Sequence, residues 1–228
     1  MIGQVITIFG LPLSEEGATR CIETGHRHGV TVETFAAVNK YRAEKLMHDM
    51  GLFPNPDTYS RICDDPIGDR ATQQKGQWHL TSPELGCALS HYLIWCKAAK
   101  ANEPTLVLEH DTILIAPVPE MPAEALAVNY DASKAPGTAG YLLTPTAANL
   151  AVAQTRRRGV EPSDELLWRS ALRGLPVHQE QRPVISTDNG GISTIQWTRS
   201  DTIHSHVVKQ DPWADFQEPP ADRRYRGT

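Results

Sequence analysis

The sequence lacks the long apolar stretch that a membrane-spanning helix requires. No uninterrupted apolar run approaches the roughly 18 residues typical of such a helix anywhere in the 228-residue chain. The first residues, MIGQVITIFGLPL, lead directly into a predicted strand, without a basic region and a cleavage site. We therefore expect a cytoplasmic protein with no transmembrane segment.

Cysteine is scarce and is not arranged in CxxC pairs. The four cysteines are Cys21, Cys63, Cys87 and Cys96, and in a reducing compartment they are expected to be free thiols. Cys87 and His91 lie four residues apart on one face of a predicted helix, where zinc could use them. Because two further ligands do not follow at ordinary zinc spacing, we interpret Cys87 as a small residue that packs within the protein.

Positive charge is not in excess either. The net charge is −5, so no global basic field draws the chain to nucleic acid or to an anionic membrane. Arginines gather only locally, at 156–158 and 223–226, and such clusters are more often solvated surface than binding patches. Hydrophobic residues make up 40% of the chain, which is enough for a core. We predict one domain over residues 1–209, followed by a polar tail over residues 210–228.

Strands and helices are predicted to alternate along most of the chain. A β-α-β opening followed by this alternation favours an α/β fold with a central sheet flanked by helices. Ser14 and Ser82 are the expected N-caps of the first and third helices. The predicted strands cover residues 4–9, 31–36, 105–109, 139–143, 183–187 and 192–197, and the predicted helices cover 14–28, 40–50, 82–101, 146–158 and 163–172, with a long loop over 51–81.

Three polar residues follow directly on the apolar strand predicted over residues 105–109. Glu109, His110 and Asp111 cannot be buried unpaired by such a strand. Two carboxylates spaced i, i+2 point to the same face, and this geometry suits a divalent cation that itself holds a phosphate. An exposed acidic turn is the simpler interpretation. Because ligands of α/β sheets collect at the carboxyl ends of strands, we predict a nucleotide site here.

Several short motifs occur in a fixed order around this strand. With them the chain resembles glycosyltransferase family 25, the lipooligosaccharide-type galactosyltransferases, over about residues 3 to 195. One departure is His110, where many members carry a second acidic residue. The motifs are GCALSH at 86–91, LEHD at 108–111, GTAGYLL at 137–143, PSDEL at 162–166 and STI at 193–195.

The resemblance implies a single-domain, GT-A-type nucleotide-diphospho-sugar transferase fold with a mixed sheet. It also implies a Mn²⁺ or Mg²⁺ ion held by Asp111 and Glu109, with Asp111 as the stronger ligand, to stabilise the departing diphosphate. A later histidine, His204 or His206, could complete the ligand set. The competing interpretation of these two histidines is an exposed polar tail.

An acceptor hydroxyl needs a general base if the reaction inverts the sugar configuration, because an alcohol is a poor nucleophile until its proton can leave. Asp164 is the predicted base, since it stands in the segment that matches the family motif, and Glu165 is the alternative. Both residues also fit plain helix capping, which requires no catalysis. Backbone amides at a helix start would hold Asp164 in place but weaken it as a base.

Donor binding is assigned to residues that the resemblance places near the nucleotide-sugar. For the glycines, tight turns explain the sequence equally well. His91 has two further interpretations, as a residue that orients the acidic strand end or as a core histidine bonded to a backbone carbonyl. The assigned residues are Gly10, Ser90, His91, His110, Gly137, Thr138, Gly140 and Tyr141.

The substrates follow from the resemblance only at the level of the family. It implies a UDP-sugar donor, such as UDP-galactose or UDP-glucose, and a surface glycan acceptor such as lipooligosaccharide. An alternative acceptor is a hydroxymethylated base of phage-type DNA, with Arg156, Arg157 and Arg158 as phosphate contacts. Further alternatives are a metal-dependent nucleotide-sugar hydrolase and a catalytically inactive nucleotide-sugar-binding module. The oligomeric state stays open.

Overall fold

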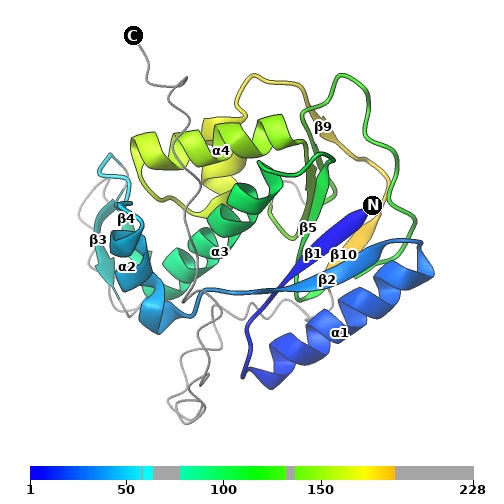
Figure 1. The fold of residues 1–228 in the computed structure, drawn as a ribbon, viewed down its shortest axis with the longest axis horizontal. Coiled ribbons are helices and arrows are strands. Elements are labelled where there is room, and N and C mark those ends of the chain that lie inside the picture. Colours follow the sequence, from blue (N-terminus) through cyan, green and yellow to red (C-terminus); the bar gives the residue numbers. More distant parts are fainter. Residues whose placement is uncertain (58, 64–77, 132–136, 188–228) are drawn as a thin grey trace.

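The computed structural model describes residues 1–57, 59–63, 78–131 and 137–187, and these residues form an α/β fold (Figure 1). The strands are β1 Ile2–Thr7, β2 Thr31–Ala36, β3 Tyr59–Cys63, β4 Trp78–Thr81, β5 Thr105–Glu109, β6 Thr112–Leu114, β7 Ala127–Asn129, β8 Gly140–Leu143, β9 Val177–Gln179 and β10 Ile185–Thr187. The helices are α1 Pro12–Arg27, α2 Lys40–Asp49, α3 Ser82–Ala98, α4 Pro145–Arg158 and the π-helix η2 Glu165–Ala171.

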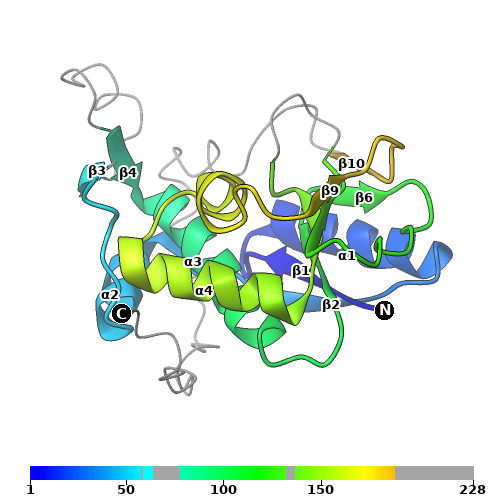
Figure 2. The same cartoon turned by 90° about the horizontal axis from the view of Figure 1, so that it is seen from above.

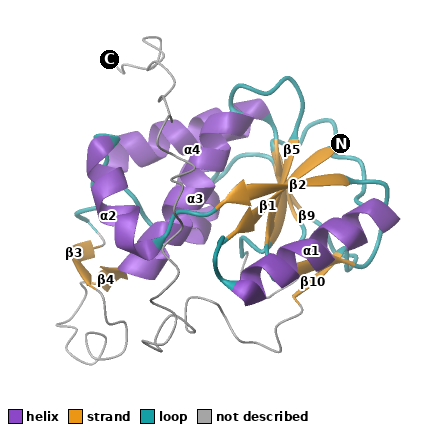
Figure 3. Cartoon of the chain, turned by 60° about the horizontal axis from the view of Figure 1, so that its bottom comes forward, coloured by secondary structure: helices purple, strands orange, loops and turns teal. Residues whose placement is uncertain are grey.

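A mixed six-stranded sheet forms the centre of the fold. Its strand order is β2-β1-β5-β8-β7-β9. β1 runs parallel to β2 and β5, whereas β8 runs antiparallel to β5 and β7. Helices α3 and α4 lie on one side of the sheet and α1 lies on the other (Figure 3). The predicted α/β fold with a central mixed sheet flanked by helices is confirmed.

Side chains of β5 alternate between two apolar cores. Leu106 and Leu108 belong to the core that contains residues of α1, and Val107 belongs to the core that contains residues of α3 and α4. Successive strand residues point to opposite faces, so Glu109 continues the series of Val107 toward α3. Tyr141 pairs with Val107 in the neighbouring strand β8 and faces the same way. The sheet thereby directs two polar side chains into one mainly apolar layer.

The predicted N-caps of two helices are wrong. Thr81, not Ser82, caps α3: its side chain accepts from the backbone N–H of Glu84, and the Glu84 carboxylate accepts from the N–H of Thr81 in return. Ser14 lies inside α1, where its hydroxyl accepts from the N–H of Ile8 at 2.8 Å. Ser82 is the first residue of α3 and Ser14 is the third residue of α1, so the predicted helices themselves are confirmed.

The predicted loop over 51–81 is wrong in part, because it contains β3 and β4, which pair in parallel. These strands lie beside α2 at one end of the molecule, and β9 and β10 lie at the other (Figure 2). The segment predicted as an ordinary helix over 163–172 contains the π-helix η2. The strand predicted over 192–197 and the tail over 210–228 lie outside the described residues.

Within the described part of the chain, no helix has both the length and the apolar character needed to cross a membrane.

Candidate active site

The family motif on α3 fixes how this helix packs. A side chain at Gly86 would come within 2.8 Å of the carbonyl oxygen of Val38, so only glycine allows this close approach. Ser90 accepts from the N–H of Val38 at 2.8 Å and donates to the carbonyl of Gly86 at 2.7 Å. Its hydroxyl is thus buried in a contact between α3 and the segment after β2. A donor contact by Ser90 stays a prediction.

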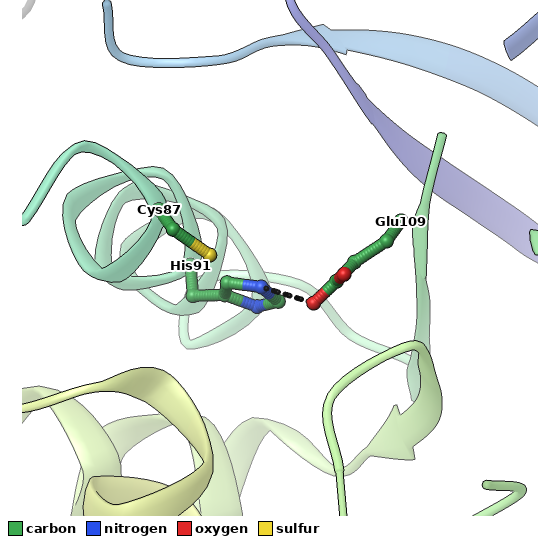
Figure 4. Close-up of side chains that lie close together, drawn as sticks. All are labelled: Cys87, His91 and Glu109. Atoms are coloured by element: carbon green, nitrogen blue, oxygen red, sulfur yellow. Dashed lines mark ion pairs between the residues drawn. The ribbon is translucent and has the colours of Figure 1, made fainter. Parts of the chain in front are cut away.

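The carboxylate of Glu109 reaches toward α3 from the end of β5 (Figure 4). Its Oε1 accepts a hydrogen bond from Thr138 at 2.9 Å and lies 3.4 Å from Nε2 of His91. Ligand-type atoms of Cys87, His91 and Glu109 all lie within 4.8 Å of one another. The structure therefore joins Cys87, which the sequence assigned to packing, with two predicted site residues.

A chain of hydrogen-bond donors leads to this carboxylate. Trp95 Nε1 donates to the hydroxyl of Tyr141 at 2.9 Å, and that hydroxyl lies 2.6 Å from Nδ1 of His91. An indole N–H can only donate, and Tyr141 has one hydrogen of its own. The balanced assignment has Tyr141 donate to Nδ1, which leaves the hydrogen of His91 on Nε2, on the side of Glu109. The hydrogen of His91 thus faces the acidic strand end, and a role of His91 in orienting that end stays a prediction.

Burial and neighbouring groups set the protonation of the cluster. Burial alone raises the pKa of Glu109, but the contacts with His91 and Thr138 and the nearby His110 outweigh it, so the pKa of this carboxyl is lowered. Burial, reinforced by the charge of Glu109, raises the pKa of the Cys87 thiol far above its usual range. Near neutral pH the cluster therefore contains an ionised carboxylate and a protonated thiol, and Cys87 is not a thiolate nucleophile.

His110 and Asp111 form the turn after β5. His110 is buried, and its carbonyl packs so closely on α1 that any side chain at Gly17 would clash with it. Burial lowers the pKa of His110 more than the neighbouring Asp111 and Glu109 raise it, so the imidazole is neutral near pH 7. Asp111 is half-buried and is not a member of the group formed by Cys87, His91 and Glu109.

The start of η2 joins the same network. The Ser163 hydroxyl lies 3.1 Å from the hydroxyl of Thr138 and hydrogen-bonds the sulfur of Cys87. The next residue, Asp164, is half-buried and makes no side-chain cap bond to η2, so helix capping does not account for it. Glu165 forms an ion pair with Arg169 at 2.8 Å on the surface of the helix.

Gly137, before β8, and Gly140, the first residue of β8, lie close to η2 and to β10 respectively. Trp168 of η2 donates from Nε1 to the carbonyl of Gly137 at 2.9 Å, and its ring meets Tyr141 edge-on with centroids 5.7 Å apart. A side chain at Gly140 would come within 2.7 Å of Ile185. Sequence reasoning missed Trp168 because no motif marks it. The PSDEL segment, which ends two residues before Trp168, was the signal that could have drawn attention to it.

Gly10 occupies the strand-to-helix turn after β1. Its φ is +82°, a left-handed conformation that favours glycine. Its backbone N–H donates to the carboxylate of Glu15 at 2.8 Å. The turn alone accounts for this glycine, and a donor contact stays a prediction.

The predicted acceptor-binding arginines are not brought to the cluster. Arg156–Arg158 form the last turn of α4 and contact residues elsewhere: Arg156 donates to the hydroxyl of Tyr92 at 3.2 Å, and the next two contact Gln154 and Glu161. His204 and His206 lie outside the described residues.

Comparison with known proteins agrees with the motifs. Residues 18–128 match the family model of Glycosyltransferase family 25 (LPS biosynthesis protein). This match confirms the predicted class of enzyme, a glycosyltransferase. The matching family is the one that the motifs predicted, and the matched segment includes α3 and the acidic end of β5. None of the curated proteins matches the chain significantly.

Three solved structures share a distant likeness with the chain. The apo-form glycosyltransferase GlyE of Streptococcus pneumoniae TIGR4 is 10% identical, with a TM-score of 0.43, and the match covers 78% of this chain but only 44% of GlyE. The galactosyltransferase LgtC, in complex with donor and acceptor sugar analogs, is 8% identical, with a TM-score of 0.41 and coverage of 78% and 73%. A Drosophila galactosyltransferase 7 mutant, in complex with manganese, UDP-Gal and xylobiose, is 10% identical, with a TM-score of 0.43 and coverage of 92% and 81%. Scores this low carry no functional argument, so the class rests on the family match.

Proposed function

We propose that this protein transfers a hexose from a nucleotide-diphospho-sugar to a hydroxyl group of a glycan, with the help of a divalent metal ion. The observation that carries the proposal is the meeting of four family motifs around one acidic strand end. Cys87 and His91 from α3, Thr138 from the segment before β8, and Ser163 from the start of η2 all surround Glu109. Residues so far apart in sequence have no local structural reason to converge.

The metal ion of this proposal is Mn²⁺ or Mg²⁺, held by Asp111 and Glu109. Glu109 fits the role because its pKa is lowered, so it is ionised, and because its side chain is 28% exposed at the carboxyl end of a strand. Oxygen ligands suit these hard ions. The ion would neutralise charge on the departing diphosphate. His204 or His206 stays the candidate for a third protein ligand.

The proposed general base is Asp164. It follows Ser163, whose hydroxyl contacts Thr138 beside Glu109, so it stands next to the acidic strand end. Its carboxylate makes no cap bond to η2. A base here would accept the proton of the acceptor hydroxyl as the new glycosidic bond forms, which gives inversion at the anomeric carbon. Glu165 is the weaker candidate because Arg169 already pairs with it.

The proposed donor is a UDP-sugar, and the proposed acceptor is a lipooligosaccharide-type surface glycan, in keeping with the family description. Gly137, Thr138, Gly140 and Tyr141 are the proposed neighbours of the donor. Of these, Thr138 contacts Glu109 directly, so a sugar beside it would lie near the ion.

A nucleotide-sugar panel tests this proposal. Purified protein is incubated with each donor, with or without a lipooligosaccharide core, in Mn²⁺, in Mg²⁺ and in excess chelator. We expect one donor to be consumed only with a metal ion, faster with the acceptor present, and the sugar to be recovered on the acceptor. Hydrolysis that ignores the acceptor would instead indicate a hydrolase, and binding without turnover would indicate an inactive binding module.

A further inference from the structure

We infer that Cys87, His91 and Glu109 form a three-ligand site for zinc or a similarly thiophilic ion. The inference does not depend on sugar transfer, although it uses Glu109, which the proposed function also assigns to Mn²⁺ or Mg²⁺; one carboxylate oxygen of Glu109 would then serve each ion. A thiol, an imidazole and a carboxylate are the three side-chain types that zinc uses. They come from two elements, with Cys87 and His91 one helical turn apart on α3 and Glu109 at the end of β5 (Figure 4).

The separation of His91 and Glu109 also suits two ligands of one ion. Nε2 of His91 is 3.4 Å from Oε1 of Glu109, beyond the range of about 2.7–3.2 Å for an ordinary N–H···O bond. Two ligands about 2.0 Å from a tetrahedral zinc lie about 3.3 Å apart. The Cys87 sulfur is within 4.8 Å of both atoms, so all three ligand atoms can face one ion.

The environment of His91 is the second observation. His91 is fully buried, and among the described residues its Nε2 has no hydrogen-bond partner. A buried polar atom without a partner is unfavourable. A metal ion at this position would give Nε2 a partner, with the imidazole hydrogen then on Nδ1.

Each of the three side chains already has an outer partner. The Tyr141 hydroxyl lies 2.6 Å from Nδ1 of His91. Its oxygen can accept a hydrogen bond from the N–H that metal binding would place at Nδ1. Ser163 hydrogen-bonds the sulfur of Cys87, and Thr138 donates to Glu109. Such partners orient metal ligands and hold their protonation state.

The ligand set also selects the ion. A thiolate favours zinc and other soft ions, whereas Mn²⁺ and Mg²⁺ prefer oxygen ligands. Binding would release the thiol proton of Cys87 to solvent and leave the thiolate on the metal, with no change of oxidation state. With three protein ligands, the fourth position of a tetrahedral ion would be open to water. Zinc would then tie the carboxyl end of β5 to α3.

Cobalt absorption tests the site without any enzyme assay. Full-length protein, stripped with chelator, is titrated with Co²⁺, and the sulfur-to-cobalt charge-transfer band is followed in the near ultraviolet. We expect one equivalent to produce the band, equimolar Zn²⁺ to remove it, and excess Mn²⁺ to leave it. Cys87→Ser should abolish the band. The matched control is Cys96→Ser, a buried cysteine on the same helix, which should keep it.

Two further variants keep the test decisive if Cys87→Ser fails to fold, as judged by circular dichroism. Glu109→Gln should weaken Zn²⁺ affinity by more than about 100-fold, because loss of an outer partner alone costs about 10–100-fold. Tyr141→Phe should weaken it by about 10–100-fold. Absence of the band in the unmodified protein, a band that survives Cys87→Ser, or unchanged affinity in both further variants would overturn the inference.

Discussion

The polar cluster around Glu109 and the arginine-rich end of α4 both carry conspicuous side chains, and the fold uses them differently. Thr138 and Glu109 are 29 residues apart in the sequence, and Tyr141 and His91 are 50 apart, yet each pair is hydrogen-bonded. Arg157, by contrast, bonds Gln154, only three residues away. Basic residues at a helix C-terminus are stabilised by the helix itself. Arg156 does reach a distant residue, the hydroxyl of Tyr92, but the three arginines do not share one buried network, whereas the polar residues around Glu109 do.

The largest effect on the rate of sugar transfer is expected from a substitution at the acidic strand end. Asp111→Asn keeps the side-chain volume but removes the charge. The rate of sugar transfer should therefore fall, with a loss on the order of several kcal/mol of transition-state stabilisation if the ion neutralises the departing diphosphate. Steady-state turnover in Mn²⁺ measures it, and an unchanged melting temperature shows that the fold is intact. Full turnover in excess chelator would contradict the metal requirement.

The base is tested one element further along. Asp164→Asn should cut turnover by roughly 10²–10⁴-fold, with donor affinity nearly unchanged, because proton acceptance matters only in the transition state. Glu165→Gln, at the neighbouring position, is the matched control and should retain most activity. If Asp164→Asn instead leaves turnover near normal and costs about 1 kcal/mol or less of stability, the residue is structural.

Elements with a strong local pattern could be predicted from the sequence. β2 and β5 follow from their β-branched and apolar residues, and α1 and α3 from helix-start signals close to their first residues. The caps were misplaced because adjacent hydroxyl residues, Thr81 and Ser82, offer the same local chemistry, and only the backbone at the helix start distinguishes them. β3 and β4 were missed because short strands in a polar, proline-containing segment owe their pairing to tertiary context.

The members of the candidate site could also be found individually, because motifs mark His91, Glu109 and Thr138. The place of Cys87 could not, since its distance from Glu109 depends on how α3 packs on the sheet, and that packing depends on Gly86 meeting the segment after β2. Arg156 illustrates a contact that a charge run does not reveal. Its side chain donates to the hydroxyl of Tyr92 on α3, and the role of the arginine cluster in acceptor binding stays a prediction.

The free energy of unfolding tests how much the hydrogen bonds of Tyr141 stabilise the cluster. Tyr141→Phe removes one hydroxyl and leaves two buried groups, Trp95 Nε1 and His91 Nδ1, without their partner. Each unsatisfied group costs about 1–3 kcal/mol, so the free energy of unfolding in urea should fall by at least that amount. Tyr41→Phe is the control, because Tyr41 is 64% exposed. Equal stabilities for the two variants would show that the buried chain of donors is not energetically coupled.

The pH dependence of the free energy of unfolding in acid tests whether Glu109 is ionised in the folded protein. Its pKa is lower in the folded protein than in the unfolded chain, so its contribution is present above the ordinary carboxyl pKa of about 4.3 and is lost as the pH falls through the folded value. Urea unfolding of Glu109→Gln should therefore depend less on pH between about 5 and 3 than unfolding of the unmodified protein. A steeper dependence in the variant would reverse the assigned direction.

The smallest effect is expected at the arginine-rich end of α4. Replacement of Arg156, Arg157 and Arg158 by alanine should leave transfer to a lipooligosaccharide core nearly unchanged, because exposed ion pairs contribute at most about 1 kcal/mol each and a neutral sugar acceptor requires no phosphate contact.

The decisive comparison is a parallel assay with hydroxymethylcytosine-containing duplex DNA at two salt concentrations. Affinity for DNA falls as salt is added, and each phosphate that the protein neutralises makes the slope of log affinity against log salt more negative by about 0.9. Transfer to the modified DNA that falls with added salt and with the triple replacement would make the arginine cluster a binding surface and this protein a DNA-modifying enzyme. Transfer to the glycan alone, insensitive to both changes, would leave the acidic strand end as the functional region of the two.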